Sequence, residues 1–250
     1  MIGSKFYRLC LLCCATHLMS LPAADLVSAG QFLVAVDVGH SRANAGATSA
    51  TGIGEYDFNK SLATLLLSKV HRDGRMKLSL INENGDDMAL ADRARAAKAM
   101  GADLLISIHH DSVQPEYLTP WSHNGRSLFY CDQFHGFSVF YSERNNDPGR
   151  SLQFAKLLGS SLVGRNFSAS QHHAEMIKGE GKAVIDARIG VFRYDGLAVL
   201  RNAKMPAVLL ECGIIVNREE EKRLGDDVYK NRIVSAILKS IAVFSGARRR

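Results

Sequence analysis

The chain has 250 residues, five of them cysteines, and a formal net charge of +6 at pH 7. This length suffices for one sizeable hydrophobic core, and no low-complexity linker or internal repeat would divide it. Length and composition therefore exclude a repeat array and favour a single domain.

The first 29 residues have the pattern of a secretory signal peptide. Lys5 and Arg8 precede an apolar stretch from Leu9 to Leu21, and small residues suited to signal-peptidase cleavage follow it. The alternative is a membrane anchor, but the stretch falls short of the roughly 20 apolar residues that a spanning helix needs. We therefore expect a signal peptide over residues 1–29, no stable membrane span after its cleavage, and a periplasmic or secreted location.

The cysteines do not predict a disulfide framework. Cys10, Cys13 and Cys14 lie within the expected signal peptide, which leaves Cys131 and Cys212. These two could pair in an oxidising compartment, but Cys212 lies in a segment with the composition of a buried strand. We expect two free thiols.

The mature chain remains basic. Loss of Lys5, Arg8 and Asp25 lowers the formal charge from +6 to +5, and three arginines, Arg248–Arg250, end the chain. A basic exported protein is expected to associate with polyanions. No helix-turn-helix, RNP-like aromatic motif or zinc finger indicates nucleic acid, so cell-envelope polymers fit better. An ordinary solvated surface with a positive balance is the alternative.

Strands and helices alternate along the first half of the mature chain. The apolar pattern predicts strands over Phe32–Val38, Lys77–Ile81 and Leu104–Ile108, and helices over about Glu55–His71 and Met88–Met100. Asp86 or Asp87 is placed to cap the second helix.

The second half is less regular, and residues 165–188 fit neither a helix nor a strand pattern. We expect strands over Ser127–Cys131, Phe137–Tyr141 and Ala207–Glu211, helices over Ser151–Val163 and about Asp226–Phe244, and a further regular element at Leu197–Arg201. Short apolar strands that alternate with helices predict an α/β domain, with a mostly parallel sheet covered by helices on both faces.

Polar side chains follow the predicted strands. His40, His109 and Glu211 lie at or just beyond strand carboxyl ends, where open α/β sheets form their ligand crevice, and Glu55 at a helix start could reach the same rim. Two imidazoles and one carboxylate make a three-ligand zinc site with a fourth position open for water. Taken singly, His40 and Glu55 would be capping or loop residues, so only the combination predicts the site.

Glu211 ends the apolar run Pro206–Glu211, in which no residue obviously neutralises its charge. Such a carboxylate is a candidate general base, and beside a metal site it indicates a hydrolase. The alternative is a structural ion pair with a nearby arginine such as Arg201.

Several motifs together resemble one known family. Asp37-Val-Gly-His40, with Gly46-Ala47, Gly52 and Glu55-Tyr-Asp-Phe-Asn59, resembles the first zinc motif of the zinc-dependent N-acetylmuramoyl-L-alanine amidases of the Amidase_3 family. Ala102–His109 is similar to their second motif, and Leu200-Arg201, Met205–Gly213 and Asn217-Arg-Glu-Glu are similar to their closing motif. The resemblance runs from about Phe32 to Phe244 and departs at Ser41–Asn44, where the family usually has glycines.

The resemblance implies a twisted sheet of about six strands, Zn²⁺ ligation by His40, Glu55 and His109, and an acid/base role for Glu211. It also implies cleavage of the amide between N-acetylmuramic acid and the L-alanine of the stem peptide, in peptidoglycan or muropeptides. Residues 30–250 would form this zinc amidase catalytic domain. In some members a segment blocks the zinc until an activator protein removes it.

The second motif contains two adjacent histidines. We assign His109 as the ligand because it directly follows the Ser-Ile pair of the motif. Neighbours on a strand point to opposite faces, so both cannot easily bind one ion. His110 is then expected to support a ligand, contact substrate or lie in a loop.

The unassigned residues 165–188 contain a second group of polar side chains, His172, His173, Glu175 and Glu180. By the resemblance, Glu175 or Glu180 could supply a carboxylate that blocks the open metal position. A substrate-contacting or solvated loop is the alternative.

Two other functions fit part of this pattern. A zinc carboxypeptidase-type cell-wall peptidase would want an arginine clamp and a closer His-x-x-Glu spacing, which His40 and Glu55 lack. A non-catalytic envelope-binding protein would be expected to lose a ligand or Glu211, and all four residues are present.

Overall fold

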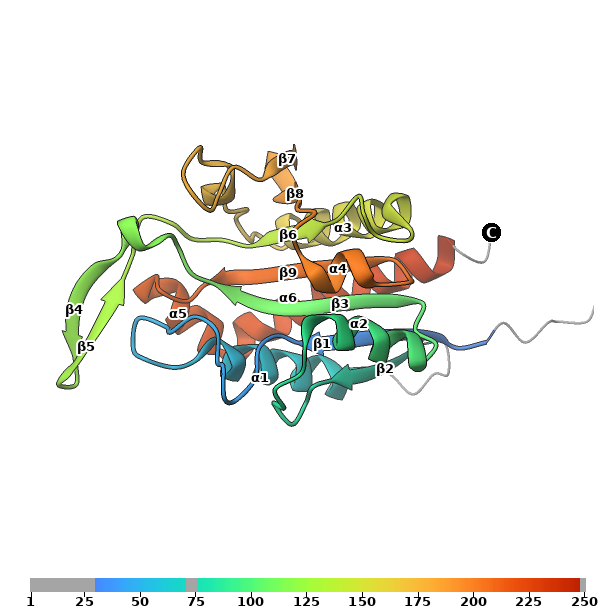
Figure 1. Cartoon of the computed structure of the whole chain (residues 1–250), viewed down its shortest axis with the longest axis horizontal. Helices are drawn as coiled ribbons and strands as arrows, with labels where there is room; N and C mark the ends of the chain where they lie inside the picture. Colours follow the sequence, from blue (N-terminus) through green and yellow to red (C-terminus); the bar gives the residue numbers. More distant parts are fainter. Residues whose placement is uncertain (1–29, 71–75, 248–250) are drawn as a thin grey trace, which may run out of the picture. The chain divides into compact units, whose positions relative to one another are not determined.

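A seven-stranded sheet forms the centre of the fold in a computed structural model, which describes residues 30–70 and 76–247 (Figure 1). Its strand order is β2-β1-β3-β9-β6-β8-β7. The β6–β9 and β7–β8 pairs are antiparallel, and the other pairs are parallel. The strands are β1 (Phe32–Val38), β2 (Met76–Ile81), β3 (Leu104–Asp111), β6 (Ser138–Tyr141), β7 (Ala183–Asp186), β8 (Val191–Arg193) and β9 (Ala207–Ile214).

Alternation along the central strands divides the buried side chains between two faces, because neighbouring residues of a strand point to opposite sides. In β3, Ile106 and Ile108 belong to the larger core, whereas Leu105 belongs to the smaller core on the other face. Helices α1 (Glu55–Ser68), α3 (Pro148–Val163) and α6 (Asp227–Ala247) pack on the larger core, and α2 (Leu90–Ala99) and α4 (Ala198–Asn202) pack on the smaller one. The predicted α/β domain with a mostly parallel, doubly covered sheet is therefore confirmed, with seven strands rather than six.

Most predicted elements are present, with corrections at their ends. Helix α1 ends at Ser68 with Lys69 as its C-cap, so the predicted helix extends too far, and of its predicted span only His71 lies outside the described residues. Neither Asp86 nor Asp87 caps α2, whose N-cap is Ala89 without a side-chain hydrogen bond. The expected signal peptide also lies outside the described residues.

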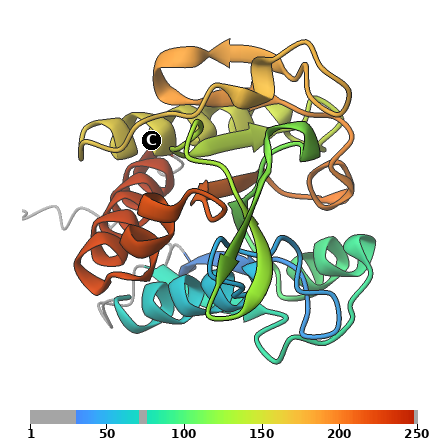
Figure 2. The same cartoon turned by 90° about the vertical axis from the view of Figure 1, so that its left-hand side faces the viewer.

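A two-stranded hairpin, β4 (Thr119–His123) and β5 (Arg126–Tyr130), follows the carboxyl end of β3. It lies at the left of Figure 1 and in front of the sheet in Figure 2. The predicted strand over Ser127–Cys131 is thus the second arm of this hairpin, outside the central sheet. The carboxyl ends of β1, β3 and β9 point toward the same side, which brings their terminal residues together.

The remaining elements complete the described chain. Helix α5 (Arg218–Gly225) follows β9, and three short 3₁₀ turns, η1 (Pro115–Tyr117), η2 (His172–Ala174) and η3 (Ala187–Ile189), lie in connections. Cys131 and Cys212 are free and buried, in separate apolar clusters. Within residues 30–70 and 76–247, no helix is long and apolar enough to cross a membrane.

Candidate active site

His40 lies two residues beyond β1 in a left-handed backbone conformation, with φ of 67°. Such a conformation is uncommon for a residue with a side chain, so neighbouring groups must hold it. The His40 carbonyl accepts hydrogen bonds from Arg93 Nη2 at 2.6 Å and from Asn82 Nδ2 at 2.7 Å. Arg93 is itself buried and paired with Asp37 at 2.8 Å. The two long-range donors therefore orient the residue that the sequence places first in the metal site.

Glu55 begins α1, where unpaired backbone N–H groups and the helix dipole favour a carboxylate. Its side chain is 5% exposed, and its Oε1 accepts hydrogen bonds from Asn59 Nδ2 and the His110 backbone N–H. Burial by itself raises the pKa of Glu55, but the hydrogen bonds and charges of His109 and His40 outweigh it and lower the pKa below its usual range. The structure thus keeps Glu55 ionised.

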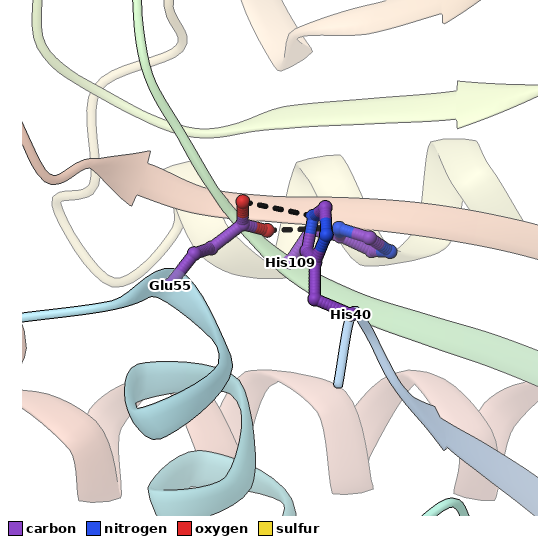
Figure 3. Close-up of side chains that lie close together, drawn as sticks. All are labelled: His40, Glu55 and His109. Atoms are coloured by element: carbon purple, nitrogen blue, oxygen red, sulfur yellow. Dashed lines mark hydrogen bonds and ion pairs between the residues drawn. The ribbon is translucent and has the colours of Figure 1, made fainter. Parts of the chain in front are cut away.

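The three predicted ligands meet at the strand ends (Figure 3). His40 Nε2 lies 2.9 Å from Glu55 Oε2, and His109 Nδ1 lies 2.9 Å from Glu55 Oε1. One nitrogen or oxygen of each residue lies within 4.8 Å of those of the other two, as one metal ion requires. Nitrogen, nitrogen and carboxylate oxygen form a donor set that suits zinc. The residues present therefore fit the metal that the sequence implies.

Two glycines allow the three side chains to approach so closely. A Cβ atom on Gly39 would lie 2.4 Å from the His109 ring. A Cβ atom on Gly46 would lie 2.4 Å from Glu55 Oε2 and 2.6 Å from the His40 ring, and Gly46 also has a positive φ of 76°. Any larger residue at either position would displace a candidate ligand.

His110 turns away from this group, as alternation along a strand requires. It is 2% exposed, and its Nδ1 lies 2.7 Å from Asn59 Oδ1. Burial lowers the pKa of His110 to about 3, so the ring is neutral. Because Asn59 in turn donates to Glu55, His110 supports a candidate ligand through one intermediate side chain.

Glu211 lies beside His109 in the β3–β9 register. Its Oε2 atom is buried and has no hydrogen-bond partner among the described residues. Burial, followed by the charges of Asp111 and Glu55, raises the pKa of Glu211 well above its usual range. The alternative partner Arg201 donates instead to the Gly196 carbonyl, and no ion pair of the described chain joins it to Glu211. The carboxylate thus remains unpaired beside the metal group, where a general base would act.

One hollow borders the candidate ligands and another borders the candidate base. One of about 360 Å³ is lined by His40, His109, Ser41, Asn44 and Arg93. The other, of about 180 Å³, is lined by Glu211 together with His173, Glu180, Lys182 and Tyr194. Solvent or a substrate group can therefore reach the candidate ligands and the candidate base.

The carboxylates proposed to block the metal are bound elsewhere, which corrects that expectation. Glu175 Oε2 accepts a hydrogen bond from the Tyr117 hydroxyl at 2.6 Å. Glu180 accepts one from Gln114 at 2.8 Å, and its other oxygen lies 2.9 Å from His173 Nδ1. Neither belongs to the group formed by His40, Glu55 and His109.

The sequence does not single out four residues that support the site, Asn59, Asp37, Arg93 and Asn82. Asn59 follows Glu55 by four positions, so its place on the same helix face could have been read from the sequence. Asp37 was read only as part of a motif, and its partner Arg93 is 56 residues away, a separation that no local pattern reveals.

The fold is that of amidase catalytic domains. It matches the crystal structure of the N-acetylmuramyl-L-alanine amidase Ami1 from Mycobacterium smegmatis with a TM-score of 0.65, at 22% identity over 87% of this chain and 98% of that one. The CwlD amidase from Clostridioides difficile, solved in complex with the GerS lipoprotein, matches with a TM-score of 0.64, at 20% identity over 87% of this chain and 100% of that one.

The sequence profile of the N-acetylmuramoyl-L-alanine amidase family matches residues 34–243. The chain therefore belongs to this family. It is 27% identical over 234 residues to the probable N-acetylmuramoyl-L-alanine amidase AmiB of Haemophilus influenzae, an alignment that covers 89% of this chain and 54% of the relative. The chain thus spans about half the length of this relative.

Proposed function

We propose that the protein is a zinc-dependent peptidoglycan hydrolase that cleaves the amide between N-acetylmuramic acid and the L-alanine of the stem peptide. The observation that carries the proposal is the convergence of His40, Glu55 and His109 beside the unpaired Glu211. Family membership supports the substrate class. We further propose export by residues 1–29, since peptidoglycan lies outside the cytoplasm, and an activator protein as a partner; the CwlD amidase, which has a similar fold, was solved in complex with a lipoprotein.

His40, Glu55 and His109 would hold the zinc. When bound, zinc lowers the pKa of water to about 7 and polarises a carbonyl group. The protein itself must move the proton, because an amide has a poor leaving group. Glu211 Oε2 is free to accept the proton of the attacking water and to return it to the departing nitrogen. Arg93 and Asn82 hold the His40 backbone, and Asn59 holds Glu55, so that the ligands keep their positions.

Mass spectrometry of purified peptidoglycan digested with the protein tests the proposal. Free stem peptides that begin with L-alanine are expected. Fragments cut within the stem would replace the proposal with a cell-wall peptidase, and intact peptidoglycan with full binding would indicate a non-catalytic envelope-binding protein.

The Glu211→Gln variant is the matched control in the same digestion. Glutamine keeps the size of the side chain but cannot shuttle a proton, so we expect unchanged zinc content and a rate lower by about 100- to 10,000-fold. Activity within a few-fold of wild type would contradict the role of Glu211.

A further inference from the structure

A second group of candidate metal ligands lies outside the predicted zinc site. Asp111 ends β3, and His172 and His173 form the first two residues of the 3₁₀ turn η2. His172 Nε2 lies 3.0 Å from Asp111 Oδ2, and His173 Nε2 lies 2.9 Å from the same oxygen. The two histidines are 2% and 7% exposed. Three donor atoms from distant parts of the chain thus converge at one buried point.

The other polar atom of each side chain already has a partner. The Ser112 backbone N–H donates to Asp111 Oδ1 at 2.8 Å. His172 Nδ1 lies 2.9 Å from Ser170 Oγ, and His173 Nδ1 lies 2.9 Å from Glu180 Oε2. These contacts fix the ring orientations, and only the atoms that face one another remain available.

The contact with Glu180 also determines the tautomer of His173. A carboxylate accepts hydrogen bonds, so Nδ1 carries the proton and a neutral ring presents the lone pair of Nε2 to Asp111. This carboxylate–histidine arrangement is the one that commonly supports a metal-binding imidazole. Gln114 holds the other oxygen of Glu180 at 2.8 Å, which fixes the carboxylate in turn.

The facing atoms do not satisfy one another. Asp111 Oδ2, His172 Nε2 and His173 Nε2 are all buried, and none has a properly oriented hydrogen bond within the described chain. Unsatisfied buried polar atoms are costly, and the lone pair of a neutral His173 that faces a carboxylate oxygen needs a positive charge between the two atoms. Ligand atoms around a tetrahedral ion at about 2.0–2.1 Å lie roughly 3.3 Å apart, close to the separations found here.

We propose that Asp111, His172 and His173 bind a second divalent transition-metal ion, distinct from the ion at His40, Glu55 and His109. Two imidazoles and one carboxylate favour zinc or a neighbouring first-row ion over calcium or magnesium, which prefer oxygen ligands. Of the three proposed ligands, His173 lines the hollow of about 180 Å³ that Glu211 also lines. The second ion would therefore lie near the hollow that the candidate base lines.

A protonated cluster without metal is the competing explanation. Burial by itself lowers the pKa of His173, but Asp111 and Glu180 outweigh it and raise the pKa to about 9. An imidazolium at His173 would then neutralise Asp111. In that state the Ser170 hydroxyl would donate to His172 Nδ1, the His172 Nε2–H would face Asp111, and no ion would be needed.

Metal content distinguishes the two explanations. Protein purified from the full-length chain is stripped with a chelator, reloaded with excess zinc chloride, desalted and analysed for zinc per chain. We expect two ions in the wild type, one in a His172→Gln/His173→Gln variant, one in a His40→Ala/His109→Ala variant, and two in His135→Gln, a control in which an exposed histidine is replaced. Asp111→Asn, which keeps the side-chain size, should also retain one ion.

The variants separate failure of this inference from failure of the proposed function. If the wild type bound one zinc per chain and the His172→Gln/His173→Gln variant also bound one, the second site would be ruled out. If the wild type bound one zinc per chain and only the His172→Gln/His173→Gln variant lost it, the result would support the site at Asp111, His172 and His173. It would contradict the assignment of zinc to His40, Glu55 and His109. Titration of the stripped wild type with cobalt(II), followed by visible absorption, gives the number of ions bound per chain without any substitution. If both the wild type and the His172→Gln/His173→Gln variant reached their end point at one equivalent of cobalt(II), the inference would be overturned.

Discussion

The candidate ligands are held in place by residues far from them in the sequence. His40 keeps its left-handed backbone because Arg93 and Asn82 bind its carbonyl, and Glu55 keeps its rotamer because Asn59 and the His110 backbone bind its carboxylate. Residue types and element ends sufficed to single out His40, Glu55 and His109 as candidates, since the two histidines follow apolar runs and Glu55 begins a helix. Apart from Asn59, which lies one turn after Glu55 on the same helix, the supporting contacts could not be predicted because their partners are brought together only by the folded sheet.

Separate replacement of the adjacent histidines His109 and His110 tests which of them binds the metal. His109→Ala should lose one zinc ion per chain, because its Nδ1 belongs to the candidate metal group. His110→Ala should keep the wild-type zinc content but lower the free energy of unfolding by about 1–3 kcal/mol, because it leaves the buried Asn59 Oδ1 unsatisfied. Elemental analysis and urea denaturation measure the two effects.

The opposite result would be decisive. If His109→Ala kept all of its zinc while His110→Ala lost an ion, the strand would present the other histidine to the metal.

At the scale of elements, the buried strands were predictable and the edge of the sheet was not. Strand β1 has the predicted bounds, because an unbroken apolar run between polar residues leaves little choice. Strand β7 is short, largely exposed and paired only with β8, and β8 is three residues long, although its Val191 and Phe192 are buried. Such short strands show no alternation of apolar and polar residues, so the sequence of residues 165–188 does not predict a strand.

Helix α5 could not be predicted for a similar reason, since its short, highly charged sequence shows no apolar face, although Glu220, Glu221 and Leu224 are buried. Its start is nevertheless specified by Asn217, whose Oδ1 accepts hydrogen bonds from the backbone N–H groups of Glu219 and Glu220. The Asn217 side-chain amide also donates to the carbonyls of Asp132 and Phe134, which ties α5 to the loop after β5.

Substitution of Asn217 should separate these two roles. Asn217→Ala removes the capping oxygen and the amide that donates to two carbonyls. We expect it to lower the free energy of unfolding by about 1–2 kcal/mol. Asn217→Ser keeps a capping oxygen and loses only the amide donors, so its loss should be smaller. Urea denaturation of both variants gives the comparison, and equal losses would show that capping contributes nothing here.

At the scale of the whole molecule, the three candidate zinc ligands come from three separate parts of the chain. His40 follows β1, Glu55 begins α1 and His109 lies in β3, so all three come together only in the folded state. A ligand that binds only the folded state stabilises it by an amount that grows with its free concentration. Zinc bound at this group should therefore stabilise the entire domain rather than one loop.

Chelation should accordingly lower the melting temperature. Free zinc at about a hundredfold excess over its Kd contributes about 2.7 kcal/mol per site, and each kcal/mol shifts Tm by about 2–4 °C in a domain of this size, so a shift of roughly 5–11 °C per site is expected. Calorimetry of stripped and reloaded protein measures it. The His40→Ala/His109→Ala variant provides the control, because its zinc-dependent shift must be smaller than that of the wild type if this group binds the ion. An equal shift in both proteins would place the stabilising zinc elsewhere, and the His172→Gln/His173→Gln variant would then show whether Asp111 and its two histidines bind it.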